Sequence, residues 1–444
     1  MARLFGTDGV RGEANRIVTP ELAFRLGKAG GYLLAGEGQR SNILIGKDTR
    51  ISGGMLEAAL VAGLCSVGVD ARLLGVIPTP AVAFLTRETG AAAGIVISAS
   101  HNPFGDNGIK FFGPNGFKLP DAREEEIEDL IQGNLEVLPK ALGAEVGRVE
   151  EFSSGVEEYL AYLESLFQGT LQGLKIVVDC ANGAASQISP RLFRRLGGEV
   201  VSIFDQPDGI NINHHCGSTH PEALCKAVVE QGAHLGLAHD GDADRLLAVD
   251  EKGNLVDGDQ IMMICARFLK EQNKLENNTL VVTVMSNLGL RLAMEEEGIT
   301  VRETRVGDRY VLEEMLKCGA VLGGEQSGHI IFLKQNTTGD GLITALNLLQ
   351  VMVNTGLPLS QLASRMQRFP QVMVNIPVPD KEQALASPRL AEACRKAEER
   401  LGKRGRILIR PSGTEPVIRI MAEGPNRMEL EDIVGSLAEI LRQS

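Results

Sequence analysis

Residues 94–103 have the sequence GIVISASHNP, in which a short apolar run leads directly into a polar segment. A continuous apolar run of this length, bounded by turn-forming residues, is typical of a buried strand. Ser100 therefore follows the end of a predicted strand, with His101 and Asn102 beside it and Pro103 turning the chain. In open α/β sheets ligands bind beyond the carboxyl ends of the strands, so Ser100 is a candidate functional residue.

The same plan occurs three times along the chain. In each copy a strand, a polar turn and an amphipathic helix lead to a glycine and a second strand, and a later strand runs into a polar loop. Strands alternating with helices indicate βαβ units and a largely parallel sheet. We therefore expect the three loops to occupy one equivalent position in three similar α/β domains. The opening strands are predicted at 43–46, 175–178 and 280–284, and the closing strands at 94–97, 235–238 and 320–323.

The pattern changes in the C-terminal part of the chain. Predicted strands at 372–377, 406–409 and 417–420, with a charged helical segment between the first two, indicate a small α+β domain. The predicted fold class is α/β, with three similar domains of mixed, largely parallel sheets and a smaller C-terminal α+β domain around a central cleft. The predicted domains are 1–152, 153–254, 255–366 and 367–444.

Composition narrows the possible partners and the cellular compartment. A formal net charge of −12 and only 4% aromatic residues disfavour a nucleic acid or an anionic membrane as partner. The chain opens without an apolar secretory segment, and no apolar run approaches the ~18 residues that a membrane span needs. The seven cysteines are scattered and form no Cys-x-x-Cys pair, as expected of reduced thiols in a cytoplasmic protein.

Three alternating carboxylates, Asp240, Asp242 and Asp244, follow the closing strand of the second copy. Mg²⁺ prefers oxygen ligands and often shares substrate phosphates, and crowded carboxylates repel one another unless a cation neutralises them. These properties favour a metal site over a solvated acidic loop. Arg245 stands where an EF-hand loop requires glycine, and its guanidinium is suited to a phosphate contact. A serine hydroxyl and a hard-metal site in one chain point to phosphoryl transfer.

Two further loops carry polar groups suited to a sugar phosphate. The loop 324–329, GEQSGH, closes the third copy and offers the donors and acceptors that sugar hydroxyls require, with a polar turn as the alternative. In the C-terminal domain, 410–414, RPSGT, sets a guanidinium and two hydroxyls around a glycine without forming a Walker loop. A structural turn is again the alternative, but the nearby Arg419 favours phosphate.

Two basic residues are candidates for the reacting centre. Arg11 lies in the glycine-rich segment 5–12, FGTDGVRG, which could be a phosphate-facing loop or an N-terminal turn. Lys110 lies shortly after the Ser100 segment and is a candidate acid/base or phosphate contact. An exposed position is the more common fate of such a lysine.

Four segments, SASHNP, DGDADR, GEQSGH and RPSGTEP, in this order, resemble the α-D-phosphohexomutase family over essentially the whole chain. The opening FGTDGVRG and Gln326 resemble the branch of that family that isomerises glucosamine phosphates. The phosphomannomutase/phosphoglucomutase branch, which usually carries Met at the position of Gln326, is the alternative within the family.

The resemblance implies a covalent phosphate on Ser100 and one Mg²⁺ per active site. It further implies interconversion of glucosamine 6-phosphate and glucosamine 1-phosphate, with glucosamine or glucose 1,6-bisphosphate as intermediate or activator, and it allows a homodimer. The implied metal ligands are phospho-Ser100, Asp240, Asp242 and Asp244. The implied residues around the reacting centre are Arg11, His101, Lys110, Arg245 and His329, those that bind the sugar are Glu325 and Ser327, and those that hold the second phosphate are Arg410, Ser412, Gly413 and Thr414.

Two other function classes stay open on the residues alone. A phosphohydrolase with a serine nucleophile would release inorganic phosphate, which a mutase would not. A non-catalytic regulator that binds sugar phosphates would not need a covalent acceptor, so the serine and the three aspartates argue against it.

Overall fold

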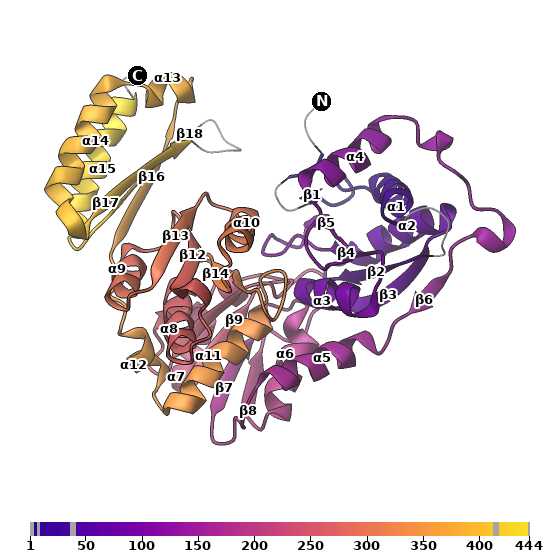
Figure 1. Cartoon of the computed structure of the whole chain (residues 1–444), viewed down its shortest axis with the longest axis horizontal. Helices are drawn as coiled ribbons and strands as arrows, with labels where there is room; N and C mark the ends of the chain where they lie inside the picture. Colours follow the sequence, from indigo (N-terminus) through magenta and orange to yellow (C-terminus); the bar gives the residue numbers. More distant parts are fainter. Residues whose placement is uncertain (1–3, 7–8, 36–40, 412–416, 443–444) are drawn as a thin grey trace. The chain divides into compact units, whose positions relative to one another are not determined.

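The computed structural model describes the chain except for residues 1–3, 7–8, 36–40, 412–416 and 443–444 (Figure 1). It forms two compact units, one of Met1–Met285 with Thr300–Ala363 and the other of Ser286–Ile299 with Ser364–Ser444. The described residues form sheets of six, five, four and three strands. The predicted α/β class, with three similar mixed sheets and a smaller α+β part, is confirmed, whereas the predicted domain boundaries stay predictions.

The first sheet has the strand order β1-β5-β4-β2-β3-β6, in which β4, β2, β3 and β6 run parallel and β5 is antiparallel to both of its neighbours. Three of these strands, β1, β5 and β6, were not predicted from the sequence, and the edge strands β1 and β6 are short. The strands are β1 (Val10–Glu13), β2 (Asn42–Lys47), β3 (Asp70–Val76), β4 (Ala93–Ile97), β5 (Asp106–Phe112) and β6 (Val149–Glu151). The helices are α1 (Pro20–Ala35), α2 (Gly53–Ser66), α3 (Thr79–Thr89) and α4 (Asp121–Gln132).

Both faces of this sheet are covered, which explains why its central strands are continuously apolar. Ile43 and Ile45 of β2 pack into a core with buried residues of α1, α2 and α4. Because side chains alternate along a strand, Leu44 and Gly46 face the opposite side, where α3 packs. A Cβ at Gly46 would lie 2.5 Å from Cγ2 of Val82, so the close approach of α3 depends on that glycine.

The second and third sheets repeat the centre of the first. Their strand orders are β11-β10-β9-β7-β8 and β13-β12-β14-β15. In each of the three sheets a central strand (β2, β7 or β12) runs parallel to both neighbours, and the last neighbour pairs with an antiparallel strand. The strands are β7 (Lys175–Asp179), β8 (Glu199–Ile203), β9 (Leu235–His239), β10 (Leu246–Asp250), β11 (Leu255–Val256), β12 (Thr279–Thr283), β13 (Thr300–Thr304), β14 (Leu322–Gly324) and β15 (Ile330–Phe332). The helices of this part are α5 (Gly155–Leu166), α6 (Ala185–Arg195), α7 (Glu222–Glu230), α8 (Gly258–Glu271), α10 (Asp308–Cys318), α11 (Gly341–Thr355) and α12 (Leu359–Ala363).

The repeat puts three loops in equivalent places. Each connects the last parallel strand of a copy to its antiparallel neighbour: β4 to β5, β9 to β10, and β14 to β15. These connections contain Ser100, the three aspartates and Glu325, respectively. The predicted equivalence of the three loops therefore holds in the structure.

The second unit contains the antiparallel sheet β16-β18-β17 and the helix α9 (Leu288–Glu296). Its core is formed by one face of the sheet together with buried residues of α15, such as Leu430 and Leu437. A fully buried carboxylate, Glu423, accepts hydrogen bonds from Arg406 Nε (2.7 Å) and from the backbone N–H of Leu288 (2.9 Å). The other elements are β16 (Gln371–Pro377), α13 (Lys381–Leu385), α14 (Pro388–Leu401), β17 (Arg406–Pro411), β18 (Val417–Glu423) and α15 (Arg427–Arg442).

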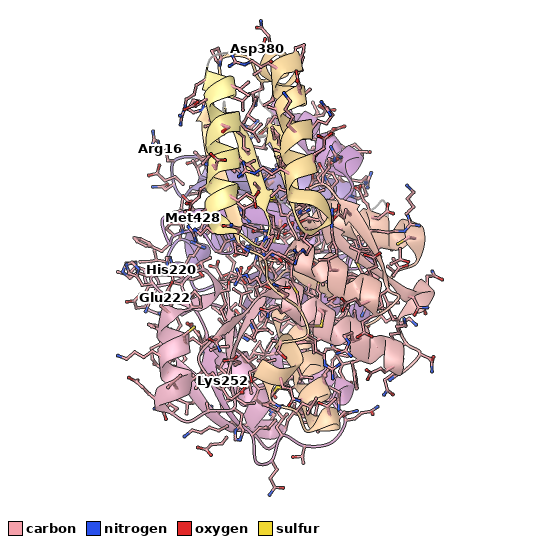
Figure 2. The ribbon with its side chains drawn as sticks, turned by 90° about the vertical axis from the view of Figure 1, so that its left-hand side faces the viewer. Arg16, His220, Glu222, Lys252, Asp380 and Met428 are labelled. Atoms are coloured by element: carbon pink, nitrogen blue, oxygen red, sulfur yellow. The ribbon has the colours of Figure 1, made fainter. Side chains whose placement is uncertain are left out.

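The surface carries scattered charges of both signs, and single apolar side chains are exposed among them. Arg16, Glu222, Lys252 and Asp380 are exposed, and Met428 is 80% exposed (Figure 2). Among the described helices, none is both long and apolar enough to cross a membrane.

We predict that Glu423→Gln destabilises the C-terminal unit, because the Arg406 guanidinium then loses its buried counter-charge. Breaking a buried ion pair from one side costs about 3–5 kcal/mol. Limited proteolysis and thermal unfolding measure the effect. The matched control is Glu431→Gln, which removes an exposed partner of Arg427 and should change stability by less than about 1 kcal/mol. Equal effects of the two substitutions would contradict the prediction.

Asp179, at the end of β7, is expected to make stability depend on pH. Burial raises the pKa of this carboxyl to about 7, although the backbone N–H groups of Ala181 and Gly217 donate to it and oppose the shift. The folded state then binds a proton that the unfolded state releases near pH 4, so this stabilising contribution is lost as the pH rises toward 7.

We predict that Asp179→Asn gains stability relative to the unsubstituted chain as the pH rises from about 4 to about 7, by about 1.4 kcal/mol for each pH unit. Denaturant melts at several pH values measure the difference. The control is Asp208→Asn, because the exposed Asp208 also accepts backbone hydrogen bonds in a turn. A difference between Asp179→Asn and the unsubstituted chain that does not change with pH would contradict the prediction.

Candidate functional site

Ser100 lies in the connection between β4 and β5 and is 2% exposed. Its hydroxyl donates a hydrogen bond to Oδ2 of Asp240 (2.6 Å), in the equivalent connection of the second sheet. The Nδ1 atom of His101 lies 3.3 Å from the same hydroxyl oxygen. The structure thus brings the predicted nucleophile and the predicted metal loop together, although 140 residues separate Ser100 from Asp240.

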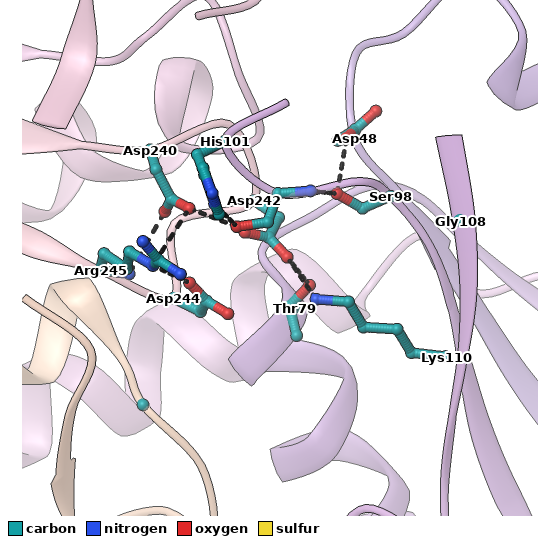
Figure 3. Close-up of polar contacts among 12 residues, drawn as sticks. Asp48, Thr79, Ser98, His101, Gly108, Lys110, Asp240, Asp242, Asp244 and Arg245 are labelled. Carbon is teal, nitrogen blue, oxygen red and sulfur yellow. Dashed lines mark hydrogen bonds and ion pairs between the residues drawn. The ribbon is translucent and has the colours of Figure 1, made fainter. Parts of the chain in front are cut away.

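Asp240, Asp242 and Asp244 form a buried cluster, in which one oxygen of each carboxylate lies within 4.8 Å of the others (Figure 3). The loop is tight, with Ala243 in the left-handed region at φ 58°. The Oδ1 atoms of Asp242 and Asp244 are buried and accept no hydrogen bond from the described residues. Buried acceptors without donors are costly, and hard cations such as Mg²⁺ take carboxylate oxygens as ligands, so the cluster fits a Mg²⁺ ion.

The pKa shifts of Asp240 and Asp244 also favour a cation at this cluster. Burial, and then the neighbouring Asp244 and Asp242, raise the pKa of Asp240 well above its usual value. Burial would also raise the pKa of Asp244, but His329 and nearby cationic groups lower it below its usual range. Three buried carboxylates cannot all ionise cheaply without a cation among them.

Lys110 of β5 is buried, whereas most lysines in proteins are exposed. Its Nζ atom lies 3.2 Å from Oδ2 of Asp242, and both side chains are at most 2% exposed. The hydroxyl of Thr79, at the start of α3, donates to the same oxygen (2.7 Å). Lys110 therefore supplies a positive charge beside the cluster.

Two guanidinium groups lie near this centre. The Nε atom of Arg245 is 4.0 Å from Oδ2 of Asp240 and 3.8 Å from Oδ1 of Asp244. Burial, together with the charges of Arg245 and Arg11, lowers the pKa of His101 to about 4. His101 is thus neutral near pH 7, beside two cations that are suited to a phosphoryl group.

His329 borders the cluster from the third sheet. Its Nδ1 atom lies 3.5 Å from Oδ2 of Asp244, and its Nε2 atom accepts a hydrogen bond from the backbone N–H of Gly339 (3.1 Å). This hydrogen bond requires a lone pair on Nε2 and leaves Nδ1 as the protonated nitrogen facing Asp244. A Cβ at position 339 would lie 2.5 Å from Nε2, so the contact depends on glycine.

The loop with Glu325 and Ser327 is attached to the metal loop through the backbone. Leu246, next to Arg245, donates its N–H to the carbonyl oxygen of Gly328 (3.0 Å). One oxygen of Glu325 accepts the N–H of Gly307 (3.0 Å), and Ser327 is exposed. The loop that is predicted to bind sugar hydroxyls therefore lies beside the metal loop.

In the C-terminal unit, Arg410 of β17 and Arg419 of β18 are directly opposite each other. Burial and the charge of Arg419 lower the pKa of Arg410, and the Nε of Arg410 is buried without a partner among the described residues. Like charges directly opposite each other on a sheet are unfavourable unless an anion lies between them. This pair therefore suits a phosphate, whereas the predicted Ser412, Gly413 and Thr414 fall outside the described residues.

Several side chains at this site were not predicted from the sequence. Arg50 and Asn213 donate to the backbone of the Ser100 loop. The polar turn after β2 contains Arg50 and the polar loop after β8 contains Asn213, but neither pattern indicates which distant loop it contacts.

Four family profiles match consecutive parts of the chain and together cover most of it. Profiles of the phosphoglucomutase/phosphomannomutase α/β/α domains I, II and III match residues 2–137, 157–253 and 257–369, and the profile of the C-terminal domain matches 373–440. The phosphoglucosamine mutase of Desulforamulus reducens is 60% identical over 441 residues, which cover 99% of each chain. That of Geobacillus thermodenitrificans is 54% identical and covers 100% of this chain and 99% of its own.

Solved structures share the fold. A phosphoglucomutase/phosphomannomutase family protein of Burkholderia thailandensis superposes with a TM-score of 0.83 at 25% identity and covers 99% of this chain and 97% of its own. Aspergillus fumigatus N-acetylphosphoglucosamine mutase, solved with GlcNAc-6P and magnesium, has a TM-score of 0.69 at 18% identity, with coverage of 99% and 95%.

We predict that Asp240→Asn removes the response of the protein to Mg²⁺ without destabilising the metal-free fold, because it relieves repulsion among the carboxylates. A cation at 100 times its Kd stabilises a folded protein by about 2.7 kcal/mol. Thermal melts at pH 8 with and without Mg²⁺ measure this response, with Asp208→Asn as control. A full Mg²⁺ response in Asp240→Asn would overturn the assignment of this ligand.

Proposed function

This chain belongs to the phosphoglucomutase/phosphomannomutase family, and we propose that it interconverts glucosamine 6-phosphate and glucosamine 1-phosphate. The observation that carries the proposal is the 2.6 Å hydrogen bond from the Ser100 hydroxyl to Asp240 within a buried cluster of three carboxylates. The full-length identity of 54–60% to phosphoglucosamine mutases supports the substrate. The reaction is an isomerisation by phosphoryl transfer.

In the proposed cycle Ser100 carries a phosphoryl group at the start. The C1 hydroxyl of glucosamine 6-phosphate attacks the phosphorus, the bond from phosphorus to Ser100 Oγ breaks, and the 1,6-bisphosphate forms. The hydroxyl proton passes to one of the bases that border the cluster: Lys110, His101 or His329. The bisphosphate then turns over, and Ser100 Oγ attacks the phosphorus at C6. The bond from that phosphorus to the C6 oxygen breaks, the C6 oxygen takes up the proton that the base had accepted, and glucosamine 1-phosphate is released.

The charged residues of the site explain how the transfer is favoured. Phosphoryl transfer depends mainly on positioning and on stabilising the negative charge of the transferring group. Asp240, Asp242 and Asp244, with an oxygen of the phosphorylated Ser100, would hold Mg²⁺, which supplies positive charge to the phosphoryl oxygens when bound. Arg245 and Arg11 add fixed positive charge around the same centre, and Lys110 would add a further charge if a histidine takes the hydroxyl proton.

The turnover of the bisphosphate requires a second place for a phosphate. The facing Arg410 and Arg419 are suited to the phosphate that does not react, together with the predicted Ser412, Gly413 and Thr414. Glu325 and Ser327 would bind the sugar hydroxyls in either orientation. A homodimer stays a prediction, as does a cytoplasmic location.

The proposal predicts that Ser100→Ala loses mutase turnover by at least about a thousandfold and no longer acquires a phosphoryl group. Intact-mass measurement after incubation with glucose 1,6-bisphosphate detects the phosphoryl group, and a coupled assay detects turnover. Ser165→Ala is the control, because its exposed hydroxyl only donates to the carbonyl oxygen of Tyr162. Full activity of Ser100→Ala would disprove the mechanism.

Relative kcat/KM on glucosamine, glucose and mannose phosphates tests the substrate. We expect glucosamine phosphate to be preferred. A preference for mannose or glucose phosphate would leave the transfer mechanism intact and replace the substrate with that of the sister branch. Release of inorganic phosphate in place of isomerisation would favour a phosphohydrolase.

A further inference from the structure

Ser100 adopts a backbone conformation that a serine rarely adopts. Its φ is 49°, in the left-handed region. This conformation costs a non-glycine residue about 1–2 kcal/mol, so it persists only where the surroundings enforce it. Part of the enforcement is local: the N–H of Ser100 donates to Oγ of Ser98 (2.9 Å), whose hydroxyl donates to Oδ2 of Asp48 (2.6 Å).

Arg50 makes most of the hydrogen bonds that hold the Ser100 loop in this conformation. It is 3% exposed, and its Nε atom donates to Oδ2 of Asp48 (2.9 Å), which balances its charge. A guanidinium has five N–H groups, and the remaining four all donate to the loop that carries Ser100. Their acceptors are the backbone carbonyl oxygens of Ser100 (2.9 Å), Asn102 (2.8 Å), Asp106 (3.1 Å) and Pro103.

Because these five contacts use every N–H of Arg50, the side chain has no donor left for a phosphate or a sugar. Arg50 therefore acts on the loop and not on the substrate. A lysine could keep the charge but could not donate to four carbonyl groups in a fixed plane. The residue type is thus explained by the geometry of the loop.

Asn213, in the loop after β8 of the second sheet, also donates hydrogen bonds to the Ser100 loop. Its Nδ2 atom donates to the carbonyl oxygens of Ser100 (2.8 Å) and Asn102 (3.1 Å), two of the acceptors that Arg50 also uses. Asn213 is 8% exposed, and a Cβ on Gly241 would lie 2.7 Å from its Nδ2. Asn213 therefore lies between the Ser100 loop and the metal loop and contacts both.

We propose that Arg50 and Asn213 are positioning residues that hold Ser100 in its left-handed conformation and fix its hydroxyl relative to the metal loop. This inference rests on the proposed function, in which Ser100 must return to one position after each transfer. Displacement of a reacting group by about 1 Å can cost a hundredfold in rate. Arg50 and Asn213 both contact backbone carbonyl oxygens of the loop, and neither contacts the Ser100 hydroxyl, which faces Asp240.

The decisive variants are Asn213→Ala, which removes two hydrogen bonds, and Asn213→Asp, which turns a carboxylate toward two carbonyl oxygens. The matched controls are Asn211→Ala and Asn211→Asp. Asn211 lies two residues away in the same loop, and among the described residues its side chain bonds only Gln206 and Asp208. Arg50→Lys is a further variant, and thermal melts show which variants fold.

We expect Asn213→Ala to lower kcat about tenfold to a hundredfold and to leave KM within about threefold, because the substrate contacts are intact. Asn213→Asp should lower kcat more than Asn213→Ala. Hydrogen exchange of the 98–107 segment should be faster in both variants and in folded Arg50→Lys, and unchanged in the Asn211 variants.

Unchanged exchange and kcat in folded Asn213→Ala would overturn the proposal. A loss confined to KM would show instead that Asn213 contacts the substrate. The hydrogen-exchange result does not depend on turnover, which separates this inference from the proposed function. An unsubstituted chain without mutase activity would remove the proposed function, and faster exchange in Asn213→Ala would still establish the clamp.

Discussion

The repulsion among Asp240, Asp242 and Asp244 is the constraint around which the other residues of the first unit are arranged. Three buried carboxylates within 4.8 Å of one another are unfavourable without a compensating charge. The chain supplies part of that charge through Lys110, which lies 3.2 Å from Asp242. The buried acceptors that remain without donors match the ligand preference of Mg²⁺, so the repulsion among the carboxylates favours binding of a cation.

The residues around this cluster are held in place by hydrogen bonds to the backbone. Ser100 must reach Asp240 from another sheet, and it does so from a strained left-handed backbone that Arg50 and Asn213 hold. His329 is held in one orientation by the N–H of Gly339. The positions of these side chains are set by backbone hydrogen bonds, which move less than contacts between long side chains.

Three copies of one sheet plan offer a simple route to such a site. Each copy ends its last parallel strand in a loop, and each loop contributes a different chemistry: a hydroxyl, a set of carboxylates, or the donors and acceptors for a sugar. The C-terminal unit departs from this plan and carries two arginines that face each other on neighbouring strands. In the proposed function, the reacting phosphate and the phosphate that does not react are held by different kinds of structure.

The sequence by itself determined the three-copy α/β plan, because apolar strands and polar loops alternate with a regular period that burial imposes. It also identified Ser100 and the three aspartates, whose residue types and spacing are chemically unusual. Only the tertiary structure decided that Lys110 is buried against Asp242, and that Arg50 and Asn213 serve the Ser100 loop. The reason is physical: local periodicity records which face of an element is buried, whereas these contacts join residues as many as 132 positions apart and depend on how the sheets pack.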